Sequence, residues 1–140
     1  MLKVVIDTNV IISAALSNDG NPSKVFEMFL SGKIENYTSE EINLEVKEVM
    51  ERRKIRELLD FQDRKFIFDN FEGNSNKVIP SEKYFEIKDD PKDNKFLDCA
   101  ALAGVDYIIS GDEHLLKLKK FKEIIIISPA DFVIKYYHIL

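Results

Sequence analysis

The sequence predicts an α/β protein in which helices cover both faces of a mostly parallel sheet. Three apolar, β-branched runs, at 4–6, 105–109 and 124–127, have the composition of strands buried in such a sheet. Helical segments alternate with these runs, as in right-handed crossover connections. Acidic residues, Asp7 and Asp112, follow two of the runs within a few positions. They are therefore expected at the carboxyl edge of the sheet, where open α/β folds bind ligands.

Composition limits the class of protein. The 140 residues predict one domain, 1–140, with an ordinary hydrophobic fraction of 45%. No apolar run reaches the roughly 20 residues of a membrane span, and no signal-peptide pattern opens the chain, so a cytoplasmic location is expected. The single cysteine, Cys99, excludes an internal disulfide. The net charge of −5 argues against a general nucleic-acid binder, unless clustered acids hold divalent cations.

The N-terminal third predicts two helices and a strand after the first run. Residues 10–16 suit a helix that Asp7 or Asn9 could simply cap, and the local sequence does not separate this interpretation from a functional carboxylate. A second helix is expected from a cap at Ser23 to Gly32, and residues 34–37 suit a short strand.

A capping box, Thr38 and Glu41, predicts a helix that runs to about residue 53. Its apolar stripe is spaced as one helical face, and Glu45 projects onto the border of that stripe, whereas Glu48 points further outward. Glu45 is thus the acid best placed to reach the sheet edge, although an ordinary i,i+4 pair is the alternative. Residues 51–72 are expected to be helical, 78–79 a short strand, and 89–92 a loop.

Residues 93–103 predict a helix that ends at Gly104. Asp93 projects into the middle of its buried, small-residue face, where a carboxylate is costly without a helix dipole or a metal beside it. Asp98 projects to the opposite side, so a solvated position is favoured over a supporting role at a metal site. A basic helix at 114–121 and a closing helix at 130–140 complete the expected order of elements.

Four acids, Asp7, Glu45, Asp93 and Asp112, thus map to one edge of the sheet. All-oxygen ligation without His or Cys favours Mg²⁺ or Mn²⁺ over zinc. Such a site suits phosphodiester hydrolysis, in which bound metal activates water and stabilises the developing charge. Three polar neighbours could position the water or a phosphate oxygen, namely Thr8, Asn9 and Ser110.

Four ordered motifs carry a resemblance to a known family: VVIDTNVIISA at 4–14, TSEEINLEVKEVM at 38–50, DDPKDNKFLDCAALAGVDYIISGDEHLL at 89–116, and IIIISPADF at 124–132. Together they resemble a PIN domain, in the VapC-like subgroup of toxins from toxin–antitoxin systems. The resemblance implies a three-layer α/β/α sandwich with a five-stranded parallel sheet and a Mg²⁺- or Mn²⁺-dependent ribonuclease. It also implies an RNA substrate, a cognate antitoxin and a homodimer.

By the same resemblance, the family's catalytic and metal-binding acids fall on Asp7, Glu45, Asp93 and Asp112. Asn9 and Ser110 fall on its accessory polar positions. Two rival classes fit less well. A haloacid-dehalogenase-type phosphatase, the nearest rival enzyme, would need an acid where Asn9 stands, and a response-regulator receiver domain orders its acids differently. A non-catalytic RNA-binding module of the same fold is the alternative from another class, and the intact set of four acids argues against it.

Overall fold

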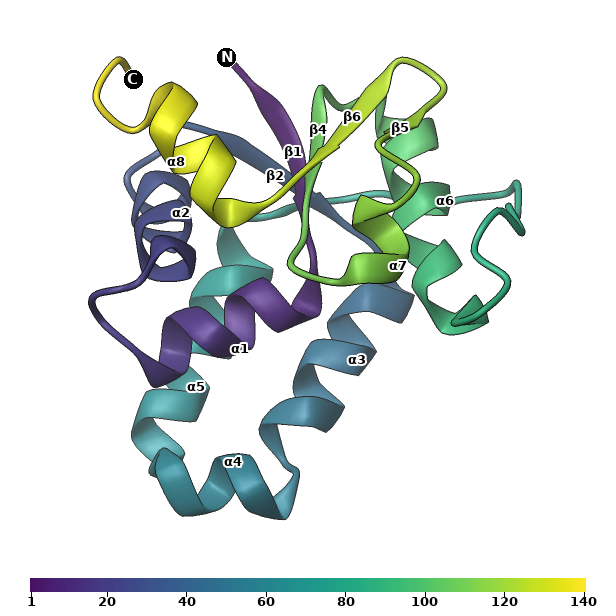
Figure 1. The fold of residues 1–140 in the computed structure, drawn as a ribbon. Coiled ribbons are helices and arrows are strands. Elements are labelled where there is room, and N and C mark those ends of the chain that lie inside the picture. Colours follow the sequence, from purple (N-terminus) through teal and green to yellow (C-terminus); the bar gives the residue numbers. More distant parts are fainter.

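A six-stranded sheet forms the centre of the computed structural model, which describes residues 1–140 (Figure 1). Its strand order is β3-β2-β1-β4-β6-β5. The first five strands in this order are parallel, and only β5 is antiparallel to its neighbour β6. The strands are β1 (Lys3–Ile6), β2 (Glu35–Thr38), β3 (Asn76–Lys77), β4 (Tyr107–Ile109), β5 (Lys120–Phe121) and β6 (Ile124–Ile127).

Helices cover both faces, which confirms the predicted α/β/α class. Figure 1 shows α2 and α8 on one side of the sheet and α6, which packs on β1, β2 and β4, on the other. The helices are α1 (Thr8–Leu16), α2 (Asn21–Leu30), α3 (Glu40–Met50), α4 (Arg53–Leu58), α5 (Phe61–Asn74), α6 (Asn94–Ala103), α7 (Glu113–Leu116) and α8 (Pro129–Tyr136), with a 3₁₀ turn, η1 (Pro91–Asp93), before α6.

The register of the central strands positions the sheet's carboxyl edge. Val4 and Val5 are fully buried, and each such side chain stabilises the fold by roughly 1.5–3 kcal/mol. Ile6 of β1 pairs with Ile109 of β4, so both strands end at the same level. The backbone N–H of Asp7 continues this pairing by donating to the Ile109 carbonyl at 2.9 Å. Residues that follow β1 and β4 therefore lie side by side.

Several helix ends differ from the sequence-based expectations because other residues cap them. Ser39, rather than Thr38, caps α3 by accepting from the Ile42 N–H at 3.3 Å, whereas Thr38 ends β2. Gly20, rather than Ser23, precedes the first turn of α2. The Ser23 hydroxyl instead donates to the Ala14 carbonyl at 3.1 Å and ties α2 to α1.

Three segments expected to be uniform are divided or shifted in the structure. The helical segment 51–72 is two helices, α4 and α5, because residue 59 is extended between them. The basic segment 114–121 is helical only through α7 and ends in β5, which pairs with β6. The strand expected at 78–79 lies two residues earlier, as β3.

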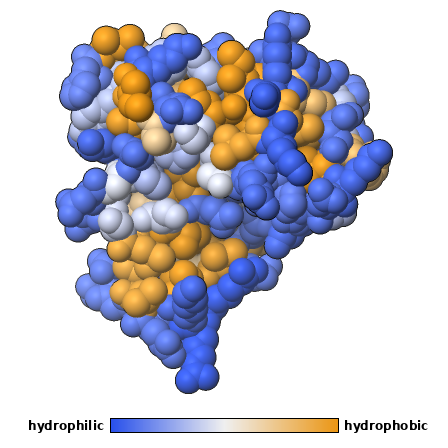
Figure 2. Space-filling view, in the orientation of Figure 1, coloured by the Kyte–Doolittle hydropathy of each residue, from blue (hydrophilic) through white to orange (hydrophobic).

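The surface carries a band of hydrophobic side chains over α1 and α5, visible in Figure 2 in the same orientation. A shallow groove between α1, α2 and α5 has an apolar lining that includes Ala14, Phe26, Leu30 and Ile67. No helix of the protein is long and apolar enough to cross a lipid bilayer.

Candidate metal centre at the carboxyl edge of the sheet

Asp7 and Ser110 meet at the ends of the two central strands. The Ser110 hydroxyl donates to Asp7 Oδ2 at 2.6 Å, and both side chains are buried. This contact follows from the β1–β4 register, which brings the two positions together although they are 103 residues apart. Asp7 occupies the N-cap position of α1, yet its carboxylate makes no capping hydrogen bond. The hydrogen bond of the carboxylate runs across the sheet edge to Ser110, and the Asn9 backbone N–H in the first turn of α1 lowers the pKa of Asp7.

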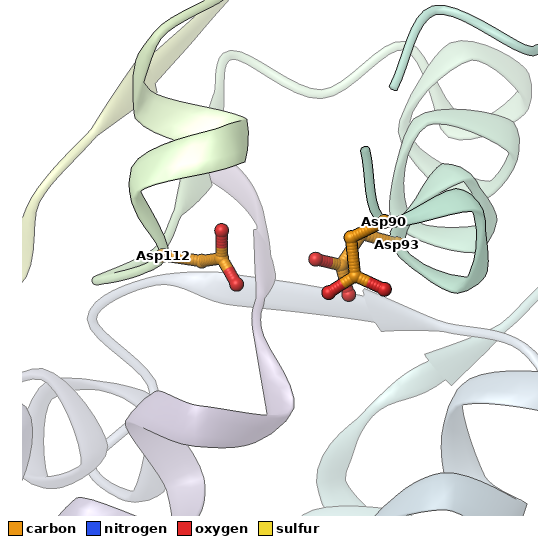
Figure 3. Close-up of side chains that lie close together, drawn as sticks. All are labelled: Asp90, Asp93 and Asp112. Carbon is orange, nitrogen blue, oxygen red and sulfur yellow. The ribbon is translucent and has the colours of Figure 1, made fainter. Parts of the chain in front are cut away.

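Asp112 is joined to the same hydroxyl. Its backbone N–H donates to Ser110 Oγ at 2.9 Å, so Ser110 connects the Asp7 carboxylate to the start of α7. Asp112 Oδ1 accepts the His114 N–H at 2.7 Å and caps α7. The Asp112 side chain faces Asp90 and Asp93, which lie just before α6, as Figure 3 shows.

Asp90 and Asp93 stand opposite Asp112 and come from one 3₁₀ turn. The Asp93 N–H donates to the Asp90 carbonyl at 3.0 Å, and residues three apart in a 3₁₀ turn project on the same side. One carboxylate oxygen from each of Asp90, Asp93 and Asp112 lies within 4.8 Å of the other two. Figure 3 shows these side chains converging from the two segments. Three oxygen donors therefore gather at one point.

The Asp93 carboxylate lacks the partner that a buried charge requires. Asp93 is 5% exposed, and its Oδ2 atom is buried without any hydrogen bond. Burial and then the neighbouring charges of Asp7, Asp90 and Asp112 raise the pKa of Asp93 to about 7, against a smaller lowering by Lys95. Buried polar atoms in native proteins are nearly always satisfied, so an orphaned carboxylate oxygen calls for an explanation. A bound cation would provide one.

The pKa of Asp7 is raised for a similar reason. Burial raises it to about 6, the Ser110 hydrogen bond opposes the rise, and the charges of Glu45 and Asp112 add to it. Two carboxyl groups of one pocket thus resist ionisation while no cation is near. This is the electrostatic pattern expected where acids are gathered to bind a positive ion.

Glu45 reaches the same region from α3 but has its own partners. Its Oε2 atom forms an ion pair with Lys95 Nζ at 2.7 Å, and its Oε1 atom accepts the Thr8 hydroxyl at 2.5 Å. Glu45 lies close enough to Asp7 to raise that residue's pKa. It is not one of the three acids whose oxygens converge within 4.8 Å.

The structure thus brings the predicted residues to one edge in two groups. Asp7, Asp112 and Ser110 form one hydrogen-bonded chain, and Glu45 and Thr8 form a second contact beside it. Asp93 faces Asp112, as described above. The remaining predicted residue is Asn9, which is exposed on the first turn of α1.

Sequence reasoning missed Asp90 and Lys95. Residues 89–92 were expected to form a loop without regular structure, but Pro91 opens η1 and Asp90 precedes it. Proline at the first helical position is a known start signal, so the spacing Asp90-Pro91-x-Asp93 could have indicated this turn. No sequence pattern indicated that Lys95, on the buried side of α6, would find an acidic partner in α3.

The expectation for Asp98 was wrong. Its side chain is buried, accepts the Tyr84 N–H at 2.8 Å and lies 4.0 Å from the Lys83 ammonium. The segment 80–88 covers this side of α6, so the helix has two buried faces. Burial raises the pKa of Asp98, and the Tyr84 hydrogen bond opposes that rise. Asp98 ties a loop to α6 and is not a solvated residue.

The residues at this edge fit a divalent cation. The converging ligands are all carboxylate oxygens, as hard cations such as Mg²⁺ and Mn²⁺ prefer, and one of them is buried without a partner. The fold and site together define an α/β protein with an acidic centre at the carboxyl edge of its sheet.

Comparison with known proteins gives the family. The PIN domain profile matches residues 3–114, so the chain belongs to the PIN domain family. PIN domains are generally nucleases and typically use divalent metals, which implies a nucleic acid as substrate. The chain is also 34% identical over 118 residues to the uncharacterized protein MJ1680 of Methanocaldococcus jannaschii, across 84% of this chain and 76% of that protein.

Proposed function

We propose that the protein is a Mg²⁺- or Mn²⁺-dependent endoribonuclease that hydrolyses phosphodiester bonds of RNA, with residues 1–140 acting as one nuclease domain. The buried, unpartnered Asp93 carboxylate, which faces Asp90 and Asp112, is the observation that carries this proposal. Family membership supports nuclease chemistry, and the all-oxygen ligand set supports a hard divalent cation.

In this proposal Asp7, Glu45, Asp93 and Asp112 are the catalytic acids. Asp90, Asp93 and Asp112 would hold the cation, and Asp7 closes the pocket from the end of β1. A bound divalent cation supplies charge stabilisation at the scissile phosphate and lowers the pKa of water.

The polar neighbours keep this arrangement fixed. Ser110 donates one hydrogen to Asp7 and accepts one from the Asp112 backbone, which locks two of the acids at the distance set by the β1–β4 register. Thr8 donates to Glu45 and orients that carboxylate. Asn9 is exposed beside the pocket, where its amide can bind a phosphate oxygen of the incoming substrate.

The test is cleavage of single-stranded RNA with Mn²⁺, Mg²⁺ or EDTA. Wild type should cleave only with metal, Asp93→Asn should lose activity by about 10² or more, and Glu48→Gln, an exposed change on α3, should retain it. RNA binding without cleavage in any metal would favour the non-catalytic module. Metal-dependent release of phosphate from a small phosphomonoester, without RNA cleavage, would favour a phosphatase.

We extend the proposal to a toxin of a toxin–antitoxin pair that acts as a homodimer. The support is the ordered set of four motifs and, for the dimer, the hydrophobic band over α1 and α5 (Figure 2). Induced expression should arrest growth, and co-expression of a small neighbouring reading frame should relieve the arrest. Light scattering should give twice the chain mass of 16.2 kDa. A harmless monomer would refute both extensions and leave the nuclease proposal standing.

A further inference from the structure

Lys95 is a buried lysine beside the acidic centre. Its side chain is 7% exposed, and its ammonium forms an ion pair with Glu45 Oε2 at 2.7 Å. Lysine is almost never this buried unless it is paired, because removing the ammonium from water is costly. The ammonium also donates to the Lys92 carbonyl at 2.6 Å and lies 5.2 Å from the centre of the Phe96 ring. Its position is therefore fixed by several contacts.

Glu45 is correspondingly occupied on both oxygens. Lys95 contacts Oε2, and the Thr8 hydroxyl donates to Oε1 at 2.5 Å, so each oxygen of Glu45 has a donor from the chain itself. Asp93 presents the contrast, since its Oδ2 atom is more deeply buried than the Glu45 side chain, which is 18% exposed, and has no donor at all. The two carboxylates belong to one site, yet only one of them lacks a positive or hydrogen-bonding partner.

Lys95 also acts on Asp93. It lies in the first turn of α6, two residues after Asp93, which is the N-cap of that helix, and it lowers the pKa of Asp93 against the effect of burial. The ammonium thus supplies positive charge to the side of the pocket formed by α3 and α6. On the other side, where Asp90, Asp93 and Asp112 converge, no positive side chain is paired with the group.

We propose that Lys95 is a positioning residue that neutralises Glu45 and replaces a second metal ion, so that the centre binds one divalent cation, at Asp90, Asp93 and Asp112. This inference rests on the proposed function, because it concerns the metal site of that nuclease. It makes Glu45 a carboxylate that Lys95 and Thr8 hold beside the bound ion, and not a ligand of that ion. A metal ligated by Glu45 would have to compete with Lys95 or with Thr8 for a carboxylate oxygen.

The test counts Mn²⁺ on the full chain by titration calorimetry and by the electron-spin resonance signal of free Mn²⁺. Wild type should bind one Mn²⁺ per chain. Glu45→Gln should keep one Mn²⁺ with an affinity within about threefold of wild type. Asp93→Asn should weaken binding by tenfold or more, because it removes the ligand that has no other partner. Comparing the two variants therefore distinguishes Asp93, a metal ligand, from Glu45, a partner of Lys95.

Lys95→Met removes the charge and retains much of the side-chain volume. It should leave the Glu45 carboxylate free and create a second, weaker Mn²⁺ equivalent. The double variant Glu45→Gln with Lys95→Met should return to one Mn²⁺, because both charges of the pair are then gone. Thermal unfolding in EDTA checks that each variant is folded. If Lys95→Met alone does not fold, the double variant and Glu45→Gln decide the question.

Each outcome has a distinct meaning. One Mn²⁺ on wild type, retained in Glu45→Gln, supports the inference. Two Mn²⁺ on wild type, with one lost in Glu45→Gln, would make Glu45 a metal ligand and overturn the inference while the nuclease proposal stands. A folded Lys95→Met with unchanged Mn²⁺ binding would overturn the inference, because Lys95 would then only join α6 to α3. Absence of Mn²⁺ binding to wild type would overturn the inference and the proposed function together.

Discussion

Asp7→Asn should stabilise the metal-free protein at neutral and alkaline pH, although it should abolish cleavage. The pKa of Asp7 is about 6 in the folded protein, against an ordinary value of 3.8. A difference of about two pKa units corresponds to roughly 3 kcal/mol of destabilisation by the charged carboxylate. Asparagine occupies the same volume, can still accept the Ser110 hydroxyl and carries no charge. For a domain of this size the gain corresponds to a rise in Tm of about 10 °C.

The sign of the pH dependence follows from the raised pKa. Between about pH 4 and pH 6 the folded protein holds a proton on Asp7 that the unfolded chain has already lost, so wild-type stability falls as the pH rises. Above about pH 6 the free energy of unfolding of wild type lies below that of Asp7→Asn by nearly the full amount. Below about pH 4 both states are protonated and the deficit vanishes. Asp7 also raises the pKa of Asp93, so the substitution relieves repulsion at a second site.

The assay is urea unfolding followed by far-ultraviolet circular dichroism in EDTA, from pH 5 to pH 8. Asp19→Asn, in an exposed loop, is the control for removal of one acidic charge and should match wild type throughout. The advantage of Asp7→Asn should grow by about 1.4 kcal/mol between pH 5 and pH 8, because roughly half of the full difference is already present at pH 5. A constant difference, or a variant less stable than wild type at pH 8, would refute the electrostatic account of the pocket.

Three further results are expected. Millimolar Mn²⁺ at about a hundredfold excess over Kd should stabilise wild type by about 2.7 kcal/mol, and Asp93→Asn should lose about half of this shift or more; an equal shift in the variant would place the ion elsewhere. Glu45→Gln should reduce RNA cleavage, whereas Glu41→Gln, an exposed change on α3, should not; equal losses would remove the special role of Glu45. Asp98→Ala should cost about 1–2 kcal/mol, because a backbone N–H of the covering segment loses its acceptor, and should leave Mn²⁺ binding unchanged.

The sheet and its acidic edge could be predicted because each strand and the acid after it can be recognised from a few neighbouring residues, without knowledge of the other strands. A β-branched run that ends in an acid specifies both a buried strand and a polar end, and parallel strands share one carboxyl edge. This reasoning placed Asp7 and Asp112 beside one another without knowledge of the β1–β4 register, which the structure provides through the Ile6–Ile109 pair. The third run, 124–127, was correctly predicted as a strand, although its Ile125 is 43% exposed.

The contacts of α6 could not be predicted in the same way. Helical periodicity identifies one apolar face, and α6 has a second covered face, where the segment 80–88 packs on Asp98. Nothing in the order of residues 80–88 marks them as a cover, because they form no regular element. The pairing of Lys95 with Glu45 was hidden for a related reason: it depends on how α3 and α6 pack together, a tertiary contact that neither helix encodes alone.

The acidic centre differs from the core around it, because it buries carboxylates where the core buries apolar side chains. The central strands bury apolar side chains completely, whereas Asp93 buries a carboxylate oxygen with no partner and Asp7 a carboxylate whose pKa is raised to about 6. Each buried acid lowers the stability of the metal-free fold, so the surrounding sheet must stabilise an arrangement that the acids themselves oppose. The chain supplies partners for two of the acids: the Ser110 hydroxyl donates to Asp7, and the Lys95 ammonium pairs with Glu45. The Asp93 Oδ2 atom has no such partner, and for this reason we expect a bound cation to supply the missing positive charge.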